Sequence, residues 1–213
     1  MILDLMLSAL MLQAAGAAQT PSSGTAKLIA LYDSARDDDA RETIVRYLAE
    51  RGDAAAINKL VEIARSDVDN DVRETAVRRL AEQPGEESLT RLTKLFADIG
   101  DTDLKETILR RIAERSEPKA EEFLRGIAFS EREDSELRET AVRRIAEHAG
   151  DGATALLIDL YDKIRDTELK ETIIRRLAER GDAKAIQKLE SIAKSDADGD
   201  LRDIALRRLA ERQ

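Results

Sequence analysis

Apolar residues recur along the chain in stripes that match one face of a helix, and these stripes return about every 32 residues. The clearest stripe lies in a ten-residue motif whose apolar positions are three and four residues apart. The motif occurs as RETIVRYLAE (41–50), RETAVRRLAE (73–82), KETILRRIAE (105–114), RETAVRRIAE (138–147), KETIIRRLAE (170–179) and RDIALRRLAE (202–211). Successive copies start 32, 32, 33, 32 and 32 residues apart. This regularity predicts six copies of one structural unit.

A second apolar stripe precedes each motif with the same period. One of its positions is always leucine, at Leu28, Leu60, Leu92, Leu124, Leu157 and Leu189. Each unit is therefore predicted to be two amphipathic helices, an A helix followed by a B helix, at about 25–52, 53–84, 85–117, 118–150, 151–181 and 182–213. A pair of this size cannot bury its apolar stripe alone, so neighbouring pairs must stack. The predicted fold is all-α, a right-handed α-solenoid of six two-helix repeats.

Residues that favour helix ends separate the predicted helices. One position before each B helix holds residue types preferred as N-caps, and we expect the caps there: Asp38, Asn70, Thr102, Ser135, Thr167 and Gly199. Helix-ending residues follow the B helices at Gly52, Pro84–Gly85, Pro118, Gly150 and Gly181.

Side-chain size alternates from one unit to the next. In the A helices, Tyr32, Ala64, Phe96, Ala128, Tyr161 and Ala193 share a position; in the B helices, Ile44, Ala76, Ile108, Ala141, Ile173 and Ala205 share another. Large and small side chains that take turns can pack closely between layers. The pattern predicts a double repeat of 64 residues, present three times.

The first residues differ from the repeats. Residues 1–18 are apolar with Asp4 as the single charge, and residues 19–24 have the composition of a linker. Three interpretations stay open for 1–18: a signal peptide without its usual positive start, a helix that covers the first repeat, or a membrane anchor. A signal peptide would place the protein outside the cell or in a periplasm, and otherwise it would be cytoplasmic.

The segments at 66–82 and 195–211 resemble HEAT repeats, especially the short bacterial HEAT-like kind. The matching features include the acidic turn at Asp69, followed by Val72, Arg73, Ala76 and Leu80. The resemblance spans about residues 25–213 and implies an armadillo-type α-solenoid. It also implies that the basic residues opening the motifs link adjacent repeats through the turn aspartates, at Arg41, Arg73, Lys105, Arg138, Lys170 and Arg202.

The composition narrows the chemistry. The net charge is −9, which disfavours a general nucleic-acid binder, and the absence of cysteine removes thiolate catalysis. His148 is the single histidine, at the end of a B helix, where a surface role is the simplest interpretation. The turns Asp67-x-Asp69-x-Asp71 and Asp196-x-Asp198-x-Asp200 imitate calcium loops but lack the glycine and the final acid that such loops need. Neither catalysis, a metal nor a cofactor is expected, although some HEAT-like proteins are bilin-lyase subunits.

Arginine pairs mark five of the six B helices. The first members, called here the leading arginines, are Arg78, Arg110, Arg143, Arg175 and Arg207; the second members, the trailing arginines, are Arg79, Arg111, Arg144, Arg176 and Arg208. A glutamate stands four residues before most leading arginines, at Glu74, Glu106, Glu139 and Glu171, an order that favours an ion pair. The trailing arginines lack such an acid, so we expect their charge to be met by a neighbouring helix or by a partner. Tyr47 takes the trailing position in the first unit.

Three functions are consistent with this pattern. The favoured one is a scaffold whose concave B-helix face binds a protein partner that is acidic or extended, through both sets of arginines and Tyr47. The alternatives are a self-assembling structural solenoid, joined through its ends, and a bilin-lyase-like subunit. No nucleic acid is expected as a partner, and a membrane only if 1–18 is an anchor.

Overall fold

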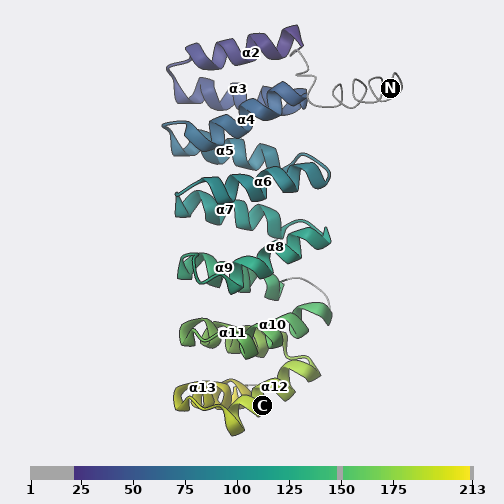
Figure 1. The fold of residues 1–213 in the computed structure, drawn as a ribbon, viewed down its shortest axis with the longest axis vertical. Helices are drawn as coiled ribbons and strands as arrows, with labels where there is room; N and C mark the ends of the chain where they lie inside the picture. Colours follow the sequence, from purple (N-terminus) through teal and green to yellow (C-terminus); the bar gives the residue numbers. More distant parts are fainter. Residues whose placement is uncertain (1–21, 148–150, 212–213) are drawn as a thin grey trace, which may run out of the picture. The chain divides into compact units, whose positions relative to one another are not determined.

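The computed structural model describes residues 22–147 and 151–211, and the regular elements of this part are all α-helices. They form six helical hairpins, each with an A helix and a B helix (Figure 1). Their bounds are α2 Ser23–Ser34, α3 Asp38–Arg51, α4 Ala54–Ser66, α5 Asn70–Ala81, α6 Glu86–Asp98, α7 Thr102–Ala113, α8 Pro118–Phe129, α9 Ser135–Glu147, α10 Asp151–Lys163, α11 Thr167–Arg180, α12 Ala183–Ser195 and α13 Gly199–Ala210. The chain divides into two compact units, one ending at Gln83 and one starting at Pro84.

The first unit contains two stacked hairpins. α2 packs on α3 and α4 packs on α5, while α3 also packs against both helices of the second hairpin. Its core is formed by side chains such as Val45, Leu48, Leu60 and Val77, which are fully or almost fully buried.

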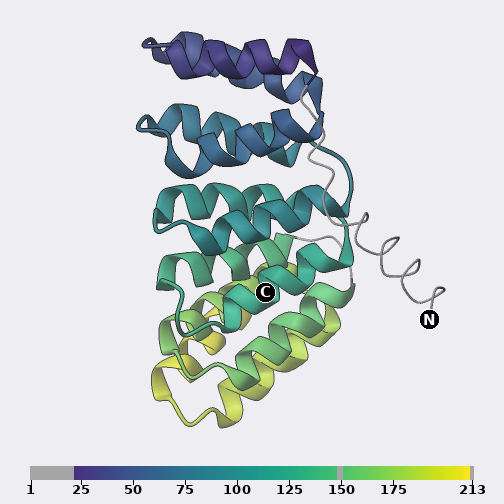
Figure 2. The same ribbon diagram turned by 45° about the horizontal axis from the view of Figure 1, so that its top comes forward.

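The second unit contains four stacked hairpins. Its B helices α7, α9, α11 and α13 pack one after another, and the layers are visible in both views of the ribbon (Figures 1 and 2). Leu92, Leu124, Leu157 and Leu189, which share one position of the A helix, are all completely buried. The predicted fold class, stacked two-helix repeats in an all-α chain, is confirmed within each unit.

The N-caps of the B helices lie one residue earlier than the sequence analysis placed them. Asp37, Asp69, Asp101, Asp166 and Asp198 each accept a hydrogen bond from a backbone amide in the first turn, and Asp134 accepts one from Glu136. The predicted caps are instead the first helical residues. An aspartate occupies the true position in all six copies, and its carboxylate complements the positive helix N-terminus.

Two glycines end B helices as the sequence predicts. Gly52 and Gly181 have φ values of 62° and 61°, in the left-handed region that other residues rarely adopt, and their amides close the last turns on Leu48 and Leu177. Gly150 lies outside the described residues.

The alternating side chains sit on opposite surfaces of the hairpins. Tyr32 of the first hairpin is buried whereas its counterpart Ala193 in the last hairpin is half-buried, so this position faces the next hairpin along the chain. Ile44 is half-buried whereas Ala205 is fully buried, so this second position faces the preceding hairpin.

Each junction inside the two units is therefore expected to combine one large and one small side chain. The two residues that occupy these positions at a junction are both buried in every case: Tyr32 and Ala76, Phe96 and Ala141, Ala128 and Ile173, and Tyr161 and Ala205. This burial agrees with the 64-residue double repeat, because large and small residues exchange sides from one junction to the next.

Polar contacts repeat with the same double period. The hydroxyl of Tyr32 donates to Asp67, and that of Tyr161 donates to Asp196 at 2.8 Å, 129 residues further along the chain. In the middle double repeat the tyrosine is replaced by Phe96, whose ring meets Phe123 edge to face, with centroids 5.3 Å apart. The junction inside each double repeat is therefore sealed either by a phenol–carboxylate bond or by an aromatic pair.

Replacing Tyr161 with phenylalanine should lower the stability by about 1 kcal/mol near neutral pH, because one buried hydrogen bond is lost. Burial and the hydrogen bond to Asp196 raise the pKa of Tyr161 far above its usual value near 10. Above the usual pKa of tyrosine the unfolded chain loses the phenolic proton while the folded chain keeps it. The stability that this group contributes therefore declines as the pH rises. The difference between wild type and Tyr161→Phe should therefore shrink from pH 9 to 11, roughly around the unfolded pKa, as measured by urea unfolding. Tyr47→Phe, at an exposed tyrosine, is the matched control and should leave stability unchanged.

Within the described ranges, none of the helices has both the length and the apolar character that a membrane crossing requires. The predictions made for residues 1–18 lie outside these ranges.

Candidate functional site

Three of the six basic residues at the start of the B helices link adjacent hairpins as the family resemblance implied, two through an aspartate and one through a glutamate. Arg41 donates to Asp67 at 2.7 Å, Lys105 to Glu133 at 2.9 Å, and Arg138 to Asp166 at 2.7 Å. The other members have further contacts: Arg73 donates to the carbonyl of Ala64, Lys170 lies over the ring of Tyr161, and Arg202 donates to the carbonyl of Asp196. These contacts give the side chains a structural role within the hairpins and between them.

The carboxylates of the aspartate-rich turns are hydrogen-bonded to other groups of the protein. Asp67 accepts bonds from Arg41, Tyr32 and the amide of Asp69, while Asp69 caps the amide of Val72. Asp196 and Asp198 repeat these roles in the last hairpin. In the described part of the chain, no group of three or more metal-binding side chains is placed to hold an ion.

The leading arginines do not form the ion pairs that the sequence suggested. Arg78, Arg110 and Arg143 donate instead to the threonine three residues earlier, at 3.0, 3.1 and 2.6 Å. Two of the glutamates expected to pair with them contact the following hairpin instead. Glu139 accepts a hydrogen bond from Thr172, and Glu106 lies 4.0 Å from Arg143.

The expectation for the trailing arginines is also wrong, because their charge is met inside their own helix. Each donates to the glutamate three residues later, at 2.6–3.0 Å. We call the four pairs of the second unit the Arg–Glu ladder: Arg111–Glu114, Arg144–Glu147, Arg176–Glu179 and Arg208–Glu211. Spacing of three residues brings such side chains together on a helix, and the final glutamate of every motif supplies the acid.

The two arginine columns therefore exchange their expected roles. In the ladder the carboxylates are 52–62% exposed and the guanidinium side chains 22–36%, so the trailing arginines are largely neutralised and partly covered. Among the described residues no carboxylate lies within 4.0 Å of Arg110, Arg175 or Arg207. Arg110 and Arg207 are exposed and Arg175 is half-buried.

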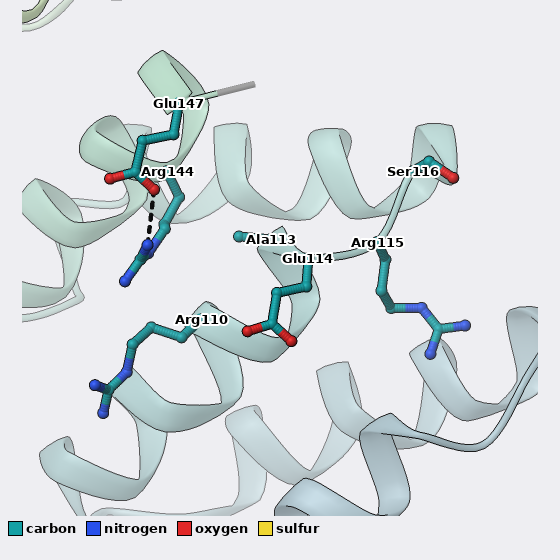
Figure 3. Close-up of a pocket in the computed structure, with 7 residues that line it drawn as sticks. All are labelled: Arg110, Ala113, Glu114, Arg115, Ser116, Arg144 and Glu147. Atoms are coloured by element: carbon teal, nitrogen blue, oxygen red, sulfur yellow. Dashed lines mark hydrogen bonds and ion pairs between the residues drawn. The ribbon is translucent and has the colours of Figure 1, made fainter. Parts of the chain in front are cut away.

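A pocket of about 310 Å³ lies where this face meets the turn between α7 and α8 (Figure 3). Its walls are formed by Arg110, Ala113, Glu114, Arg115, Ser116, Arg144 and Glu147. Arg110 and Arg144 come from the adjacent helices α7 and α9, and Arg144 is tied to Glu147. Arg115 is held by Gly85, Ser88 and Glu117. Arg115 and Ser116 were not anticipated, since they lie outside the recurring motif.

Tyr47, in the first hairpin, differs from the trailing arginines as the sequence indicated. Its ring is 52% exposed and borders a pocket of about 460 Å³ together with Leu28, Glu50 and Arg51. This pocket belongs to the first unit and is separate from the site around Arg110. His148 lies outside the described residues.

Comparison with known proteins identifies the repeats. No curated protein matches the sequence. Among solved structures, the complex of CpcE and CpcF of phycocyanin lyase from Nostoc sp. PCC7120 is similar, with 16% identity, a TM-score of 0.39, and coverage of 93% of this chain and 91% of that one. Residues 25–113 and 127–210 match the sequence family of HEAT repeats. Six helical hairpins, aspartate-capped B helices and this match over most of the chain show that the protein belongs to the HEAT-repeat family.

Proposed function

We propose that the protein is a binding scaffold, and that the B-helix face of its second unit recognises an extended acidic segment of another protein. The observation that carries the proposal is the row of leading arginines on α7, α9, α11 and α13 (Arg110, Arg143, Arg175 and Arg207). Planar guanidinium groups suit carboxylates because they can donate two parallel hydrogen bonds.

The repeat geometry favours a particular spacing of acids in the partner. Neighbouring packed helices lie about 8–10 Å apart, so the leading arginines recur at about that interval. An extended peptide advances about 3.3 Å per residue, which places a carboxylate opposite successive arginines about every third residue.

The net charge of −9 does not oppose this binding at short range. Charges on the rest of the surface are screened beyond about 8 Å at physiological ionic strength, whereas contacts with the leading arginines are direct. The Arg–Glu ladder beside them adds exposed carboxylates that would repel an acidic ligand placed out of register.

Binding accounts for the described residues better than catalysis does. The groups with strongly raised pKa values, Tyr32 and Tyr161, are buried in junctions between hairpins, where their hydroxyls seal the stack. The arginines of the B-helix face stay charged, and their guanidinium groups are suited to the recognition of acidic groups.

Fluorescence anisotropy with a labelled peptide of about 15 residues, built from Glu-Gly-Ser triplets at the spacing derived above, tests the proposal. The triple variant Arg110→Gln, Arg175→Gln and Arg207→Gln should bind at least about tenfold more weakly, since three ion pairs of about 0.5 kcal/mol each are lost. The matched control changes the trailing arginines of the same three helices, Arg111→Gln, Arg176→Gln and Arg208→Gln. It removes the same charge and should change the affinity less than about threefold, because those arginines are already paired.

A Gln-Gly-Ser peptide should not bind, and circular dichroism should show unchanged helicity in both variants. Equal losses in the two triple variants would show that only overall charge matters. Failure of the wild type to bind the acidic peptide would remove the proposal.

A further inference from the structure

The first hairpin exposes a surface that is covered in later hairpins. Leu31 is 56% exposed, whereas the equivalent Ile127, Leu160 and Ile192 are at most 7% exposed. Thr43 is exposed too, while Thr75, Thr140 and Thr172 at the same position are buried. We call Leu28, Leu31, Asp37, Thr43 and Ile44 the first-hairpin surface.

The last hairpin exposes the opposite surface. Leu206 is 52% exposed, but the equivalent Val45, Leu109, Val142 and Ile174 are completely buried. Those residues are covered by the hairpin that follows them. We call Ala193, Arg202, Asp203 and Leu206 the last-hairpin surface.

The side chains of these two surfaces are complementary in size. Between the fourth and fifth hairpins, Ala128 faces forward and Ile173 faces back, and both are completely buried. The last-hairpin surface offers Ala193 at the first of these positions, and the first-hairpin surface offers Ile44 at the second. A small residue would therefore meet a large one, as at each junction inside the two units.

The polar residues match as well. The junction between the fourth and fifth hairpins is bridged by Arg138 to Asp166 at 2.7 Å and by Thr172 to Glu139 at 3.1 Å. The corresponding residues are Arg202 and Asp203 on the last-hairpin surface, and Asp37 and Thr43 on the first-hairpin surface. Both donor–acceptor combinations are preserved.

We propose that a second copy of this chain covers these surfaces, so that the last hairpin of one copy stacks on the first hairpin of the next. The contact would reproduce the junction between the fourth and fifth hairpins. Because it joins two different surfaces, it is heterologous and generates rings or open chains of copies, not a two-fold symmetric dimer. The inference stands independently of the proposed peptide binding.

Sedimentation equilibrium of the full chain tests the proposal over roughly 1–500 µM, a range that covers micromolar to submillimolar association. The average mass should rise with concentration past that of a dimer. Thr43→Asp places a carboxylate opposite Asp203 and should weaken association at least about tenfold, and Asp203→Lys in the same chain should restore it. Thr90→Asp, at an exposed threonine of α6, is the control and should leave association unchanged.

The absence of cysteine allows the orientation to be tested directly. Chains with Thr43→Cys, mixed with chains with Asp203→Cys, should be joined as mixed pairs by a short bismaleimide, and neither variant should crosslink to itself. A wild type that stays monomeric throughout would overturn the proposal. Crosslinking of Thr43→Cys to itself would also overturn it, because two first-hairpin surfaces would then face each other. Crosslinking of Thr43→Cys to a lysine-reactive or photoreactive group placed in residues 1–21 would overturn it too, because those residues would then be the ones that cover the surface.

Discussion

Replacing Phe96 with alanine is expected to lower the free energy of unfolding by about 3–5 kcal/mol, the largest effect of any single truncation considered for the second unit. Phe96 is 2% exposed and is the largest of the fully buried side chains. Its removal leaves a cavity between the third and fourth hairpins and breaks the edge-to-face contact with Phe123. Urea unfolding followed by circular dichroism at 222 nm would measure the loss.

Two further variants make this result specific to the alternating packing. Phe129→Ala removes a ring that is only half-buried, so its effect should stay below about 2 kcal/mol. Adding Ala141→Leu to Phe96→Ala should recover part of the loss, because the small residue belongs to the same junction and its enlargement fills the space. Strictly additive effects, with less than about 0.5 kcal/mol of coupling, would contradict the idea that large and small residues compensate across a junction.

The repeat length and the apolar positions were sufficient to predict the fold. Leucine columns such as Leu92 and Leu124 become buried because a hairpin of about 30 residues has no other way to shield them than stacking. The alternation of Tyr, Phe and Ala could also be interpreted from the sequence, because a closely packed junction has room for a large side chain only where the opposite side chain is small.

Details that depend on side-chain reach were harder to predict. Either of two adjacent residues could cap the B helices, and the invariant aspartate at positions such as Asp69 and Asp101 was the better signal than the variable residue after it. The arginine pairing was reversed because each leading arginine has an acid four residues before it and each trailing arginine has a glutamate three residues after it, so spacing alone does not decide which pair forms. Glu106 and Glu139 face the next hairpin in the stack, which leaves Glu114 and Glu147 for the trailing arginines. Only tertiary structure decides between these choices.

The second large effect is expected at Asp67, whose replacement with alanine should destabilise the first unit by about 2–4 kcal/mol. The side chain is 5% exposed and accepts hydrogen bonds from Arg41, the hydroxyl of Tyr32 and the amide of Asp69. Truncation leaves a covered guanidinium and a covered phenol without their shared acceptor, although Arg41 keeps its bond to Asp38. The loss should be measured by urea unfolding at neutral pH, followed by circular dichroism.

The neighbouring Asp71 gives the matched control, because it lies in the same acidic turn but is exposed at the start of α5. Asp71→Ala should lower stability by less than about 1 kcal/mol, the usual contribution of a surface carboxylate near a helix N-terminus. If the turn instead were a calcium site, both substitutions would abolish a stabilisation by millimolar calcium, and the wild type would melt at a higher temperature with the ion than without it. We expect no such shift, because the oxygens of Asp67 and Asp69 are already committed to the hydrogen bonds that join the first two hairpins and begin the α5 helix.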